Sequence, residues 1–424
     1  MATLIGQSTM TPNPKEPGDL SAKEAAAFLD VKLPTLYAYV SRGLLRSVPG
    51  TSGKARRYRK DDLERLKARH DARSGHGPVA AGALRWGEPV LDSAITSVSG
   101  ERLRYRGHDA VELGQRGVGF EAAAELLWTG ELPPSPPRWS ADGLGYAVGT
   151  VASLLGPGAS PLTALSLVVP VLGASDLGRF GASAEVERAR ARSLILRLAA
   201  SLALPLKPVN AERAMAAPSV AHAAAVALGA KPSAPVVRAL NLALLLLADH
   251  ELNASTFAAR VTASTGADLY ACVTSALAAL SGPRHGAHCD QVEALVAEVG
   301  RPEHTAEALH LRARRGEGLP GFGHPLYPSG DPRARPLLEA AMALAPKDPG
   351  VRVVHAIVQA VADKGGEPPT TDLGLVAVAA AAGLPRGSAS ALFALGRTAG
   401  WVAHALEQRE AGFMLRPRAR YVGR

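Results

Sequence analysis

The chain has 424 residues, a net charge of +9, a hydrophobic share of 47% and an aromatic share of only 4%. Its two cysteines, Cys272 and Cys289, exclude a disulfide framework. Apolar runs such as residues 240–248 and 376–382 are too short to cross a bilayer, which excludes a membrane-spanning protein. We therefore expect a cytoplasmic protein of two or three domains, with cores built from small aliphatic side chains.

The positive charge is concentrated at the N-terminus. Residues 1–75 hold 14 Lys and Arg against 8 Asp and Glu, so +6 of the total charge of +9 lies in this short segment. Basic charge gathered in a small terminal unit is typical of nucleic-acid binding.

The first 70 residues carry the signals of a small domain behind a tail. Residues 1–17 are polar and contain three prolines, so we expect them to be disordered. Ser21 and Glu24 form a capping box that opens a helix. Pro34 suits the first turn of a second helix, which Gly43 ends. For residues 18–70 the expected elements are a helix to Leu29, a turn at 30–33, a helix over Pro34–Arg42, a strand over Leu44–Val48, a turn at 49–54, a strand over Arg56–Arg59 and a helix over Asp61–Ala68.

This order resembles the winged helix-turn-helix domains of MerR-type regulators and phage excisionases. The residues that carry the resemblance are Leu20, Ala25, Ala26, Leu36, Tyr39, Gly43, Leu44, Arg57 and Tyr58. It implies that the second helix enters a DNA major groove and that the basic wing meets phosphates. The residues assigned to DNA contact are Thr35, Tyr37, Ser41, Lys54, Arg56, Arg57 and Arg59. Two interpretations stay open beside it: a protein-docking module, and charges that only solvate the domain.

The chain changes character after a linker. Residues 71–88 are rich in Gly, Ala and Ser and join the first domain to a second one over residues 89–424. A short hairpin-like start is followed by Ala- and Leu-rich stretches separated by Gly and Pro. Little strand pattern follows, so we expect this part to be mainly α.

Three histidine-containing segments interrupt the apolar stretches of the second part. They are residues 249–256 (DHELNAST), 282–286 (GPRHG) and 321–334 (GFGHPLYPSGDPRA). A lone histidine is more often structural, but three in polar, Gly-rich breaks favour a reactive site, since Gly lets the backbone approach a ligand.

The arginines near these segments favour an anionic ligand over a metal. No pair of histidines has the close spacing of a helical zinc motif, so we predict no metal and no cofactor. Arg333, Arg397 and Arg416 suit a ligand with several carboxylates, which guanidinium groups bind bidentately. Arg397 lies in an apolar helical stretch, where a charge needs a partner.

Together these segments resemble the citrate synthase family, in the family's order along residues 89–424. The motifs are Tyr105-Arg106-Gly107, LLWTGELP at 126–133, HELNAST at 250–256, GPRHG at 282–286, GFGHPLY at 321–327 with DPRA at 331–334, Asp372, GRTAGWVAHALEQ at 396–408 and RPRARY at 416–421. The resemblance implies a two-lobed all-α fold. The large lobe would take 89–285 and 384–424, and the small lobe 286–383.

The resemblance also assigns the reacting residues. Asp372 matches the base that takes a proton from acetyl-CoA, His285 the group that stabilises the enolate, and His324 the group that polarises the ketone of oxaloacetate. The residues that match substrate ligands are His250, Arg333, Arg397 and Arg416. Arg416 matches an arginine that reaches into a partner subunit's site, so a homodimer or larger oligomer is implied.

The sequence departs from the family beside these residues, which leaves the substrate open. Pro325 follows His324 where the bacterial enzymes usually have Arg, His285 is followed by Gly-Ala-His-Cys-Asp, and Asp372 by Leu-Gly-Leu. Two alternatives therefore remain: a 2-methylcitrate synthase that uses propionyl-CoA, and a DNA-binding regulator whose synthase-like part senses citrate, oxaloacetate or an acyl-CoA.

Overall fold

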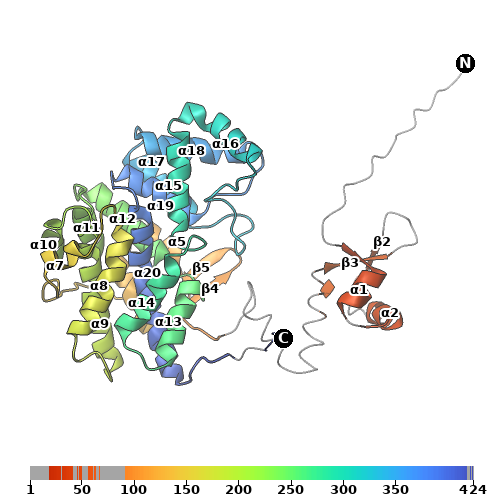
Figure 1. Cartoon of the computed structure of the whole chain (residues 1–424), viewed down its shortest axis with the longest axis horizontal. Coiled ribbons are helices and arrows are strands. Elements are labelled where there is room, and N and C mark those ends of the chain that lie inside the picture. The colour runs from red at the N-terminus through yellow and green to blue at the C-terminus, as the bar shows by residue number, and fades with distance from the viewer. Residues whose placement is uncertain are drawn as a thin grey trace, which may run out of the picture. The chain divides into compact units, whose positions relative to one another are not determined.

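The computed structural model describes residues 19–29, 31–41, 45, 47–49, 56–60, 62–63, 66, 91–417, 421 and 423. The chain divides into two compact units, Met1–Asp92 and Ser93–Arg424 (Figure 1). The expected tail at 1–17, the turn residue Lys54 and the expected linker at 71–88 lie outside the described residues. No helix in the described ranges is long and apolar enough to span a membrane.

The first unit contains the first two of its three expected helices, α1 (Ala22–Phe28) and α2 (Leu33–Ser41). Most of the third, expected over Asp61–Ala68, lies outside the described residues. The capping box of α1 is present: Glu24 N donates to Ser21 Oγ at 3.3 Å, and Ser21 N donates to the Glu24 carboxylate at 2.8 Å. Helix α2 begins one residue before the predicted Pro34. Pro34 still lies in the first turn, where the missing N–H costs nothing.

A three-stranded antiparallel sheet completes this unit. Its strands are β1 (Asp19–Ser21), β2 (Ser47–Pro49) and β3 (Arg56–Arg59), in the order β1-β3-β2. Strand β1 was not predicted, and the strand expected from Leu44 begins at Ser47. Tyr58 points inward from β3 and is 1% exposed. The small core consists of Ala25, Ala26, Leu29, Leu36, Leu45, Tyr58, Leu63 and Leu66.

The second unit opens with the hairpin-like segment and continues with helices. The strands β4 (Thr96–Ser99), β5 (Arg102–Tyr105) and β6 (His108–Asp109) form one antiparallel sheet. Gly100 and Glu101, with φ of 57° and 59°, make the tight turn between the first two.

Helices form the rest of this unit, as the sequence predicts for a mainly α fold. They are α5 (Ala110–Gln115), α6 (Phe120–Thr129), α7 (Val148–Ser153), α8 (Pro161–Ser175), α9 (Ala184–Ser201), α10 (Asn210–Met215), α11 (Val220–Ala227), α12 (Ala234–Leu247), α13 (Ala254–Ser264), α14 (Leu269–Leu280), α15 (His288–Val299), the 3-10 turn η1 (Pro302–His304), α16 (Thr305–Arg314), α17 (Ala334–Leu344), α18 (Pro349–Ala362), α19 (Thr371–Ala381) and α20 (Ser388–Ala411).

Helix α20 is the centre of the second unit. Every residue from Ser388 to Ala405 is buried, and the helix packs against α6, α8, α9, α12, α13, α14, α15 and α19 (Figure 1). Small residues permit this close packing: a Cβ added at Gly396 would lie 2.9 Å from the Leu244 carbonyl oxygen of α12. The Ala-rich, aromatic-poor composition is thus used for close helix contacts.

Helices α15 to α19 gather at one end of the unit (Figure 1). They have a small core of their own, made of Leu295, Val299, Ala308, Val353, Ile357 and Val361. Other residues of the same helices, such as Val292 and Leu373, belong to the main core. The division into lobes at 286 and 383 stays a prediction.

Candidate active site

Two of the predicted histidines lie side by side although 74 positions separate them. His250 follows the end of α12, and His324 lies in the loop before α17. Their rings are 5.4 Å apart, and His250 Nε2 is 2.9 Å from the hydroxyl of Tyr327. The fold therefore brings the DHELNAST and GFGHPLY segments to one place.

His285 is held by a serine of the first segment. It lies in the loop between α14 and α15, and its Nε2 is 2.7 Å from Ser255 Oγ. Trp401 of α20 donates its indole N–H to the same oxygen at 3.1 Å. The Phe393 ring, 6.0 Å away, meets the imidazole edge to face. One ring nitrogen is thus fixed by the protein, which orients the other for a ligand.

Asp372 is half-buried in the first turn of α19, where the helix dipole favours a carboxylate. Each of its oxygens accepts one hydrogen bond. Thr370 Oγ1 donates to Oδ2 at 3.0 Å, and the Cys289 thiol of α15 donates to Oδ1 at 3.3 Å.

Arg333 is buried in a two-point ion pair. Its Nε and Nη2 each lie 2.9 Å from the Asp331 carboxylate, and both residues are at most 5% exposed. Burial by itself would raise the pKa of Asp331, but the charge and hydrogen bonds of Arg333 outweigh it and the pKa is lowered. The same carboxylate accepts a hydrogen bond from Thr371 N at 3.1 Å, which ties Arg333 to the residue before Asp372.

Arg397 is buried and forms no ion pair among the described residues, although the charge of the buried Asp249 carboxylate acts on it. It is 1% exposed on α20, donates from Nε to the Leu247 carbonyl at 2.7 Å, and lies 4.8 Å from the Phe393 ring centre. Among the described residues, its Nη2 has no hydrogen-bond partner. Burial lowers the pKa of Arg397 to about 10; the charge of Asp249 opposes this effect, and the charge of Arg333 adds to it. A buried cation in this state is costly unless an anion completes it.

Burial and the charges of the site favour the neutral form of its three histidines. Burial is the main cause that lowers the pKa of His250 well below its usual value, followed by the charges of Arg333 and Arg397. Burial and then Arg397 lower the pKa of His285 to about 4. Burial and then Arg333 lower the pKa of His324. A neutral imidazole still carries one N–H group, which can donate a hydrogen bond to an oxyanion.

The remaining predicted site residues lie elsewhere. Arg416 is exposed beyond the end of α20. In the first unit Tyr37 is 52% exposed and Ser41 is exposed, but Thr35 is half-buried. Arg56, Arg57 and Arg59 are exposed on β3.

Several residues of the cluster had no role in the sequence analysis. They are Ser255, Cys289, Tyr327, Asp331 and Thr370. Ser255, Tyr327 and Asp331 stand inside the motifs that were recognised, so their polar side chains could have been included. Nothing in the sequence places Cys289 beside Asp372.

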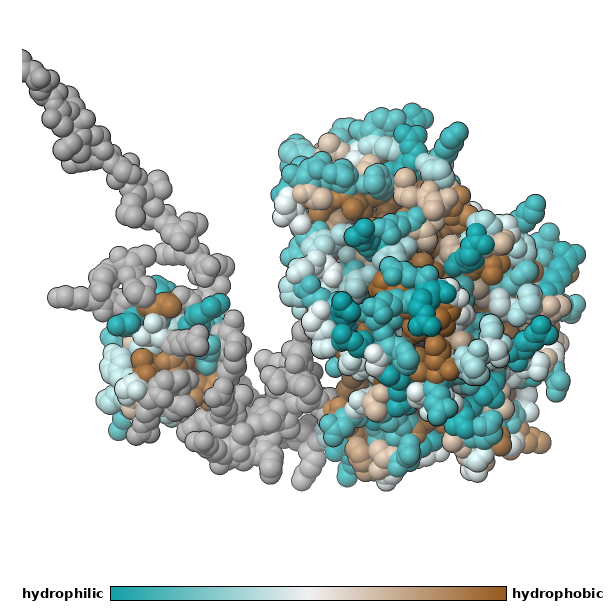
Figure 2. Space-filling view, turned by 180° about the vertical axis from the view of Figure 1, so that it is seen from behind, coloured by the Kyte–Doolittle hydropathy of each residue, from teal (hydrophilic) through white to brown (hydrophobic). Residues whose placement is uncertain are grey.

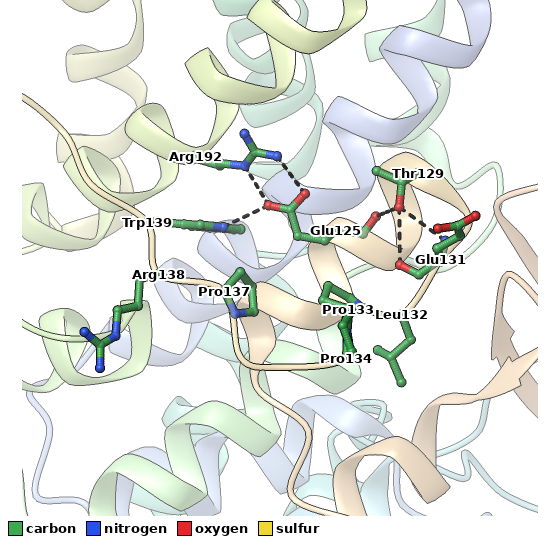
Figure 3. A pocket seen from close by; sticks show the side chains of 10 residues that line it. All are labelled: Glu125, Thr129, Glu131, Leu132, Pro133, Pro134, Pro137, Arg138, Trp139 and Arg192. Atoms are coloured by element: carbon green, nitrogen blue, oxygen red, sulfur yellow. Dashed lines mark hydrogen bonds and ion pairs between the residues drawn. The ribbon is translucent and has the colours of Figure 1, made fainter.

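A surface pocket of about 400 Å³ lies apart from this cluster (Figure 3). It is lined by residues of α6, α9 and the loop after α6. Its buried carboxylate, Glu125, is already satisfied by Arg192 at 2.6 and 2.9 Å and by the Trp139 indole at 2.9 Å. We therefore place the candidate chemistry at the histidines and not in this pocket. In the described ranges there is no group of three or more His, Cys, Asp and Glu that could hold a metal ion.

Comparison with protein families gives two matches. Residues 83–418 match the family described as citrate synthase, C-terminal domain, and residues 20–71 match a helix-turn-helix domain.

Similar relatives include citrate synthases and a 2-methylcitrate synthase. The chain is 30% identical over 356 residues to the citrate synthase of Mycolicibacterium smegmatis, which covers 80% of this chain and 94% of that protein. It is 37% identical over 198 residues to citrate synthase 2 of Bacillus subtilis, which is 46% of this chain and 53% of that protein. It is 30% identical over 338 residues to a 2-methylcitrate synthase of Mycobacterium tuberculosis, covering 76% of this chain and 84% of that protein.

A solved structure agrees with these relatives. The citrate synthase of Thermoplasma acidophilum, in a ternary complex with carboxymethyl coenzyme A and oxaloacetate, matches with a TM-score of 0.68 and 28% identity. The match covers 79% of this chain and 94% of that one.

Proposed function

The chain belongs to the citrate synthase family, and from this premise we propose that it condenses acetyl-CoA with oxaloacetate, releasing citrate and CoA. The observation that carries the proposal is Arg397, a buried guanidinium whose Nη2 has no hydrogen-bond partner in the part of the chain that the structure describes. A carboxylate of oxaloacetate would complete it, with Arg333 and His250 nearby for the rest of the dianion.

The arrangement supports a role for each reacting residue. Asp372 takes a proton from the methyl group of acetyl-CoA, while His285 donates a hydrogen bond to the thioester oxygen as it becomes an enolate. The enolate carbon bonds to the ketone carbon of oxaloacetate, whose oxygen is polarised by His324. Water then cleaves the thioester, and CoA leaves as the thiol. CoA enters as a substrate, so the reaction needs no further cofactor.

Two refinements belong to the same proposal. The site closes between the two lobes, 286–383 moving over 89–285 and 384–424, which keeps the enolate from water. Arg416 completes the site of a partner subunit, so the protein works as a homodimer or a multiple of it. Its two cysteines are free and buried, which suits the reducing cytoplasm.

Two alternatives concern the choice of acyl-CoA substrate and the role of the first unit. The similarity to a 2-methylcitrate synthase supports propionyl-CoA as an alternative substrate. The helix-turn-helix domain supports a DNA-binding role, in which the second unit would report citrate, oxaloacetate or an acyl-CoA to the first.

The test is an assay of CoA release with oxaloacetate and either acetyl-CoA or propionyl-CoA. A thiol reagent can follow the product because both cysteines of the protein are 0% exposed. Asp372→Asn is the matched control: we expect turnover to fall by about 10²- to 10⁴-fold, the usual share of general-base catalysis, with oxaloacetate binding nearly intact. No CoA release with either substrate would reject the synthase, and an active Asp372→Asn variant would reject the base.

A further inference from the structure

We infer that Cys289 is a positioning residue for the base, and that its thiol sets the orientation of the Asp372 carboxylate. The inference rests on the proposed function, because it takes Asp372 as the group that removes the proton.

The geometry fixes both carboxylate oxygens from different segments. Cys289 Sγ, in the first turn of α15, lies 3.3 Å from Oδ1, and Thr370 Oγ1, just before α19, lies 3.0 Å from Oδ2. Rotation of an Asp carboxylate about its last torsion is otherwise loosely restrained. With one donor on each oxygen, the carboxylate plane is held while the remaining lone pairs stay available to a substrate proton.

The thiol acts here as a donor and not as a nucleophile. Cys289 is 0% exposed, and burial together with the negative charge of Asp372 raises the pKa of its thiol well above the usual value. The sulfur therefore keeps its proton. An S–H group is a weak donor, so it orients the oxygen without holding the lone pairs as firmly as an O–H or N–H group would.

Hydrogen bonds of the His288 side chain and of nearby backbone groups keep the first turn of α15 in place beside the base. The neighbouring His288 accepts a hydrogen bond at Nε2 from Gly321 N at 3.1 Å. Gly321 O in turn accepts from Thr370 N at 2.8 Å, and Gly323 N donates to Pro368 O at 2.9 Å. The start of α15, the loop that leads to His324, and the segment before Asp372 are thus joined. The position of the thiol against the carboxylate is a property of this framework.

The experiment compares Cys289→Ala and Cys289→Ser with Cys272→Ala in the full-length protein. Cys272 is the matched control, because it is also 0% exposed but lies in α14 against the Ala267 carbonyl. We expect Cys289→Ala to lower kcat about 3- to 10-fold, the loss of one hydrogen bond, with KM for oxaloacetate unchanged. Proton removal should become more rate-limiting, so the isotope effect with methyl-deuterated acetyl-CoA should rise. Cys289→Ser should restore most of kcat.

Each other outcome is decisive. If the wild type releases CoA and Cys289→Ala equals Cys272→Ala in kcat and isotope effect, the inference is wrong and the proposed function stands. A loss of kcat with an unchanged isotope effect, not restored by Ser, indicates packing alone and also overturns it. If Cys289→Ala does not fold, Cys289→Val serves instead, since it fills a similar volume, removes the thiol donor and should raise the isotope effect. A wild type that releases no CoA overturns both the proposed function and the inference.

Discussion

His285 serves this site as a neutral imidazole, and its surroundings make that state persistent. Burial lowers its pKa to about 4, against about 6.5 in an unfolded chain. In the proposed reaction the ring would therefore be able to donate a hydrogen bond to the enolate oxygen throughout the neutral pH range. The same shift affects stability, because the unfolded chain takes up a proton before the folded one as the pH falls.

The sign of this effect gives the first prediction. Between about pH 6.5 and pH 4 the unfolded state binds more protons at this position, so stability falls as the pH falls and rises as the pH rises. At pH 5 the cost is about 2 kcal/mol. His285→Gln should therefore lose less stability than the wild type between pH 7 and pH 5, as measured by thermal melts.

The control for this measurement is a second pair of melts at pH 7 and pH 9. His285 does not titrate there, so the difference between the two proteins should stay constant. An equal loss for the variant and the wild type between pH 7 and pH 5 would contradict the assignment of a neutral, half-buried His285.

At the scale of elements, the contact of α20 with the end of α12 positions the segment that contains His250. Gly400 N donates to the Ala248 carbonyl at 2.9 Å, directly before Asp249 and His250. A Cβ at Gly400 would lie 2.5 Å from that carbonyl oxygen and would also meet the Asp249 carboxylate. The carbonyl is backbone, and the Asp249 carboxylate is fully buried with His404 Nε2 at 3.2 Å, so the segment itself must move.

The second prediction is that Gly400→Ala destabilises the protein by about 1–3 kcal/mol, as overpacking does, and weakens oxaloacetate binding because His250 moves. The matched control is Gly149→Ala. Gly149 is an exposed position of α7 with no atom within 4 Å of an added Cβ. This change should instead stabilise by about 0.5–1 kcal/mol. Equal melting temperatures for the two variants would show that the close approach has no energetic weight.

Elements with local signals could be predicted from the sequence, and elements without them could not. The capping box of Ser21 and Glu24 acts over three residues, so it was found. Strand β1 was not, because three residues beside a cap carry no alternation that distinguishes them from coil.

The candidate site divides in the same way. The histidines and Arg397 stand in recognisable segments, and the buried charge of Arg397 was expected to need a partner. Its partners in the chain are a carbonyl and a ring, which a sequence cannot specify. The contact of Cys289 with Asp372 joins residues 83 positions apart. It depends on α15 and α19 lying side by side, which the sequence around Cys289, Gly-Ala-His-Cys-Asp, does not indicate.

At the scale of the whole molecule, the second unit exposes several large apolar side chains, among them Leu177 at 92%, Phe180 at 60% and Met414 at 56%. Its visible face in Figure 2 is mainly polar with apolar areas between. Apolar side chains exposed one by one are normal on a monomer, so the expectation of an oligomer rests on Arg416. We expect a homodimer or a multiple of it by sedimentation.

The third prediction tests whether Arg416 acts in the partner's site. Asp372→Asn and Arg416→Ala should each be nearly inactive alone. In a mixed dimer one site carries both changes and the other carries none, so refolding an equal mixture should restore roughly a quarter of wild-type activity. No recovery, with mixed dimers present, would mean that Arg416 acts within its own chain or not at all.

The fourth prediction concerns DNA, and it depends on both units. Strand β3 carries exposed Arg56, Arg57 and Arg59 around the buried Tyr58, and Tyr37 is exposed on α2. A dimer of the second unit would carry two such units, which is how proteins of this motif bind two half-sites. If the arginines meet phosphates, affinity for genomic fragments should fall steeply with salt, with a logarithmic slope of about −0.9 for each contact.

Arg59→Ala and Tyr37→Ala separate phosphate contact from base contact in the full-length protein. Arg59→Ala should weaken binding to all fragments alike and reduce the salt slope by about 0.9, whereas Tyr37→Ala should leave the slope unchanged and reduce preference among fragments. If binding is absent at low salt, or does not respond to salt, the DNA-binding role is wrong. The charges then only solvate the domain, or the domain docks to a protein. If binding is present and oxaloacetate or citrate changes it, the two units are coupled, and by linkage DNA must change the affinity for that ligand by the same factor.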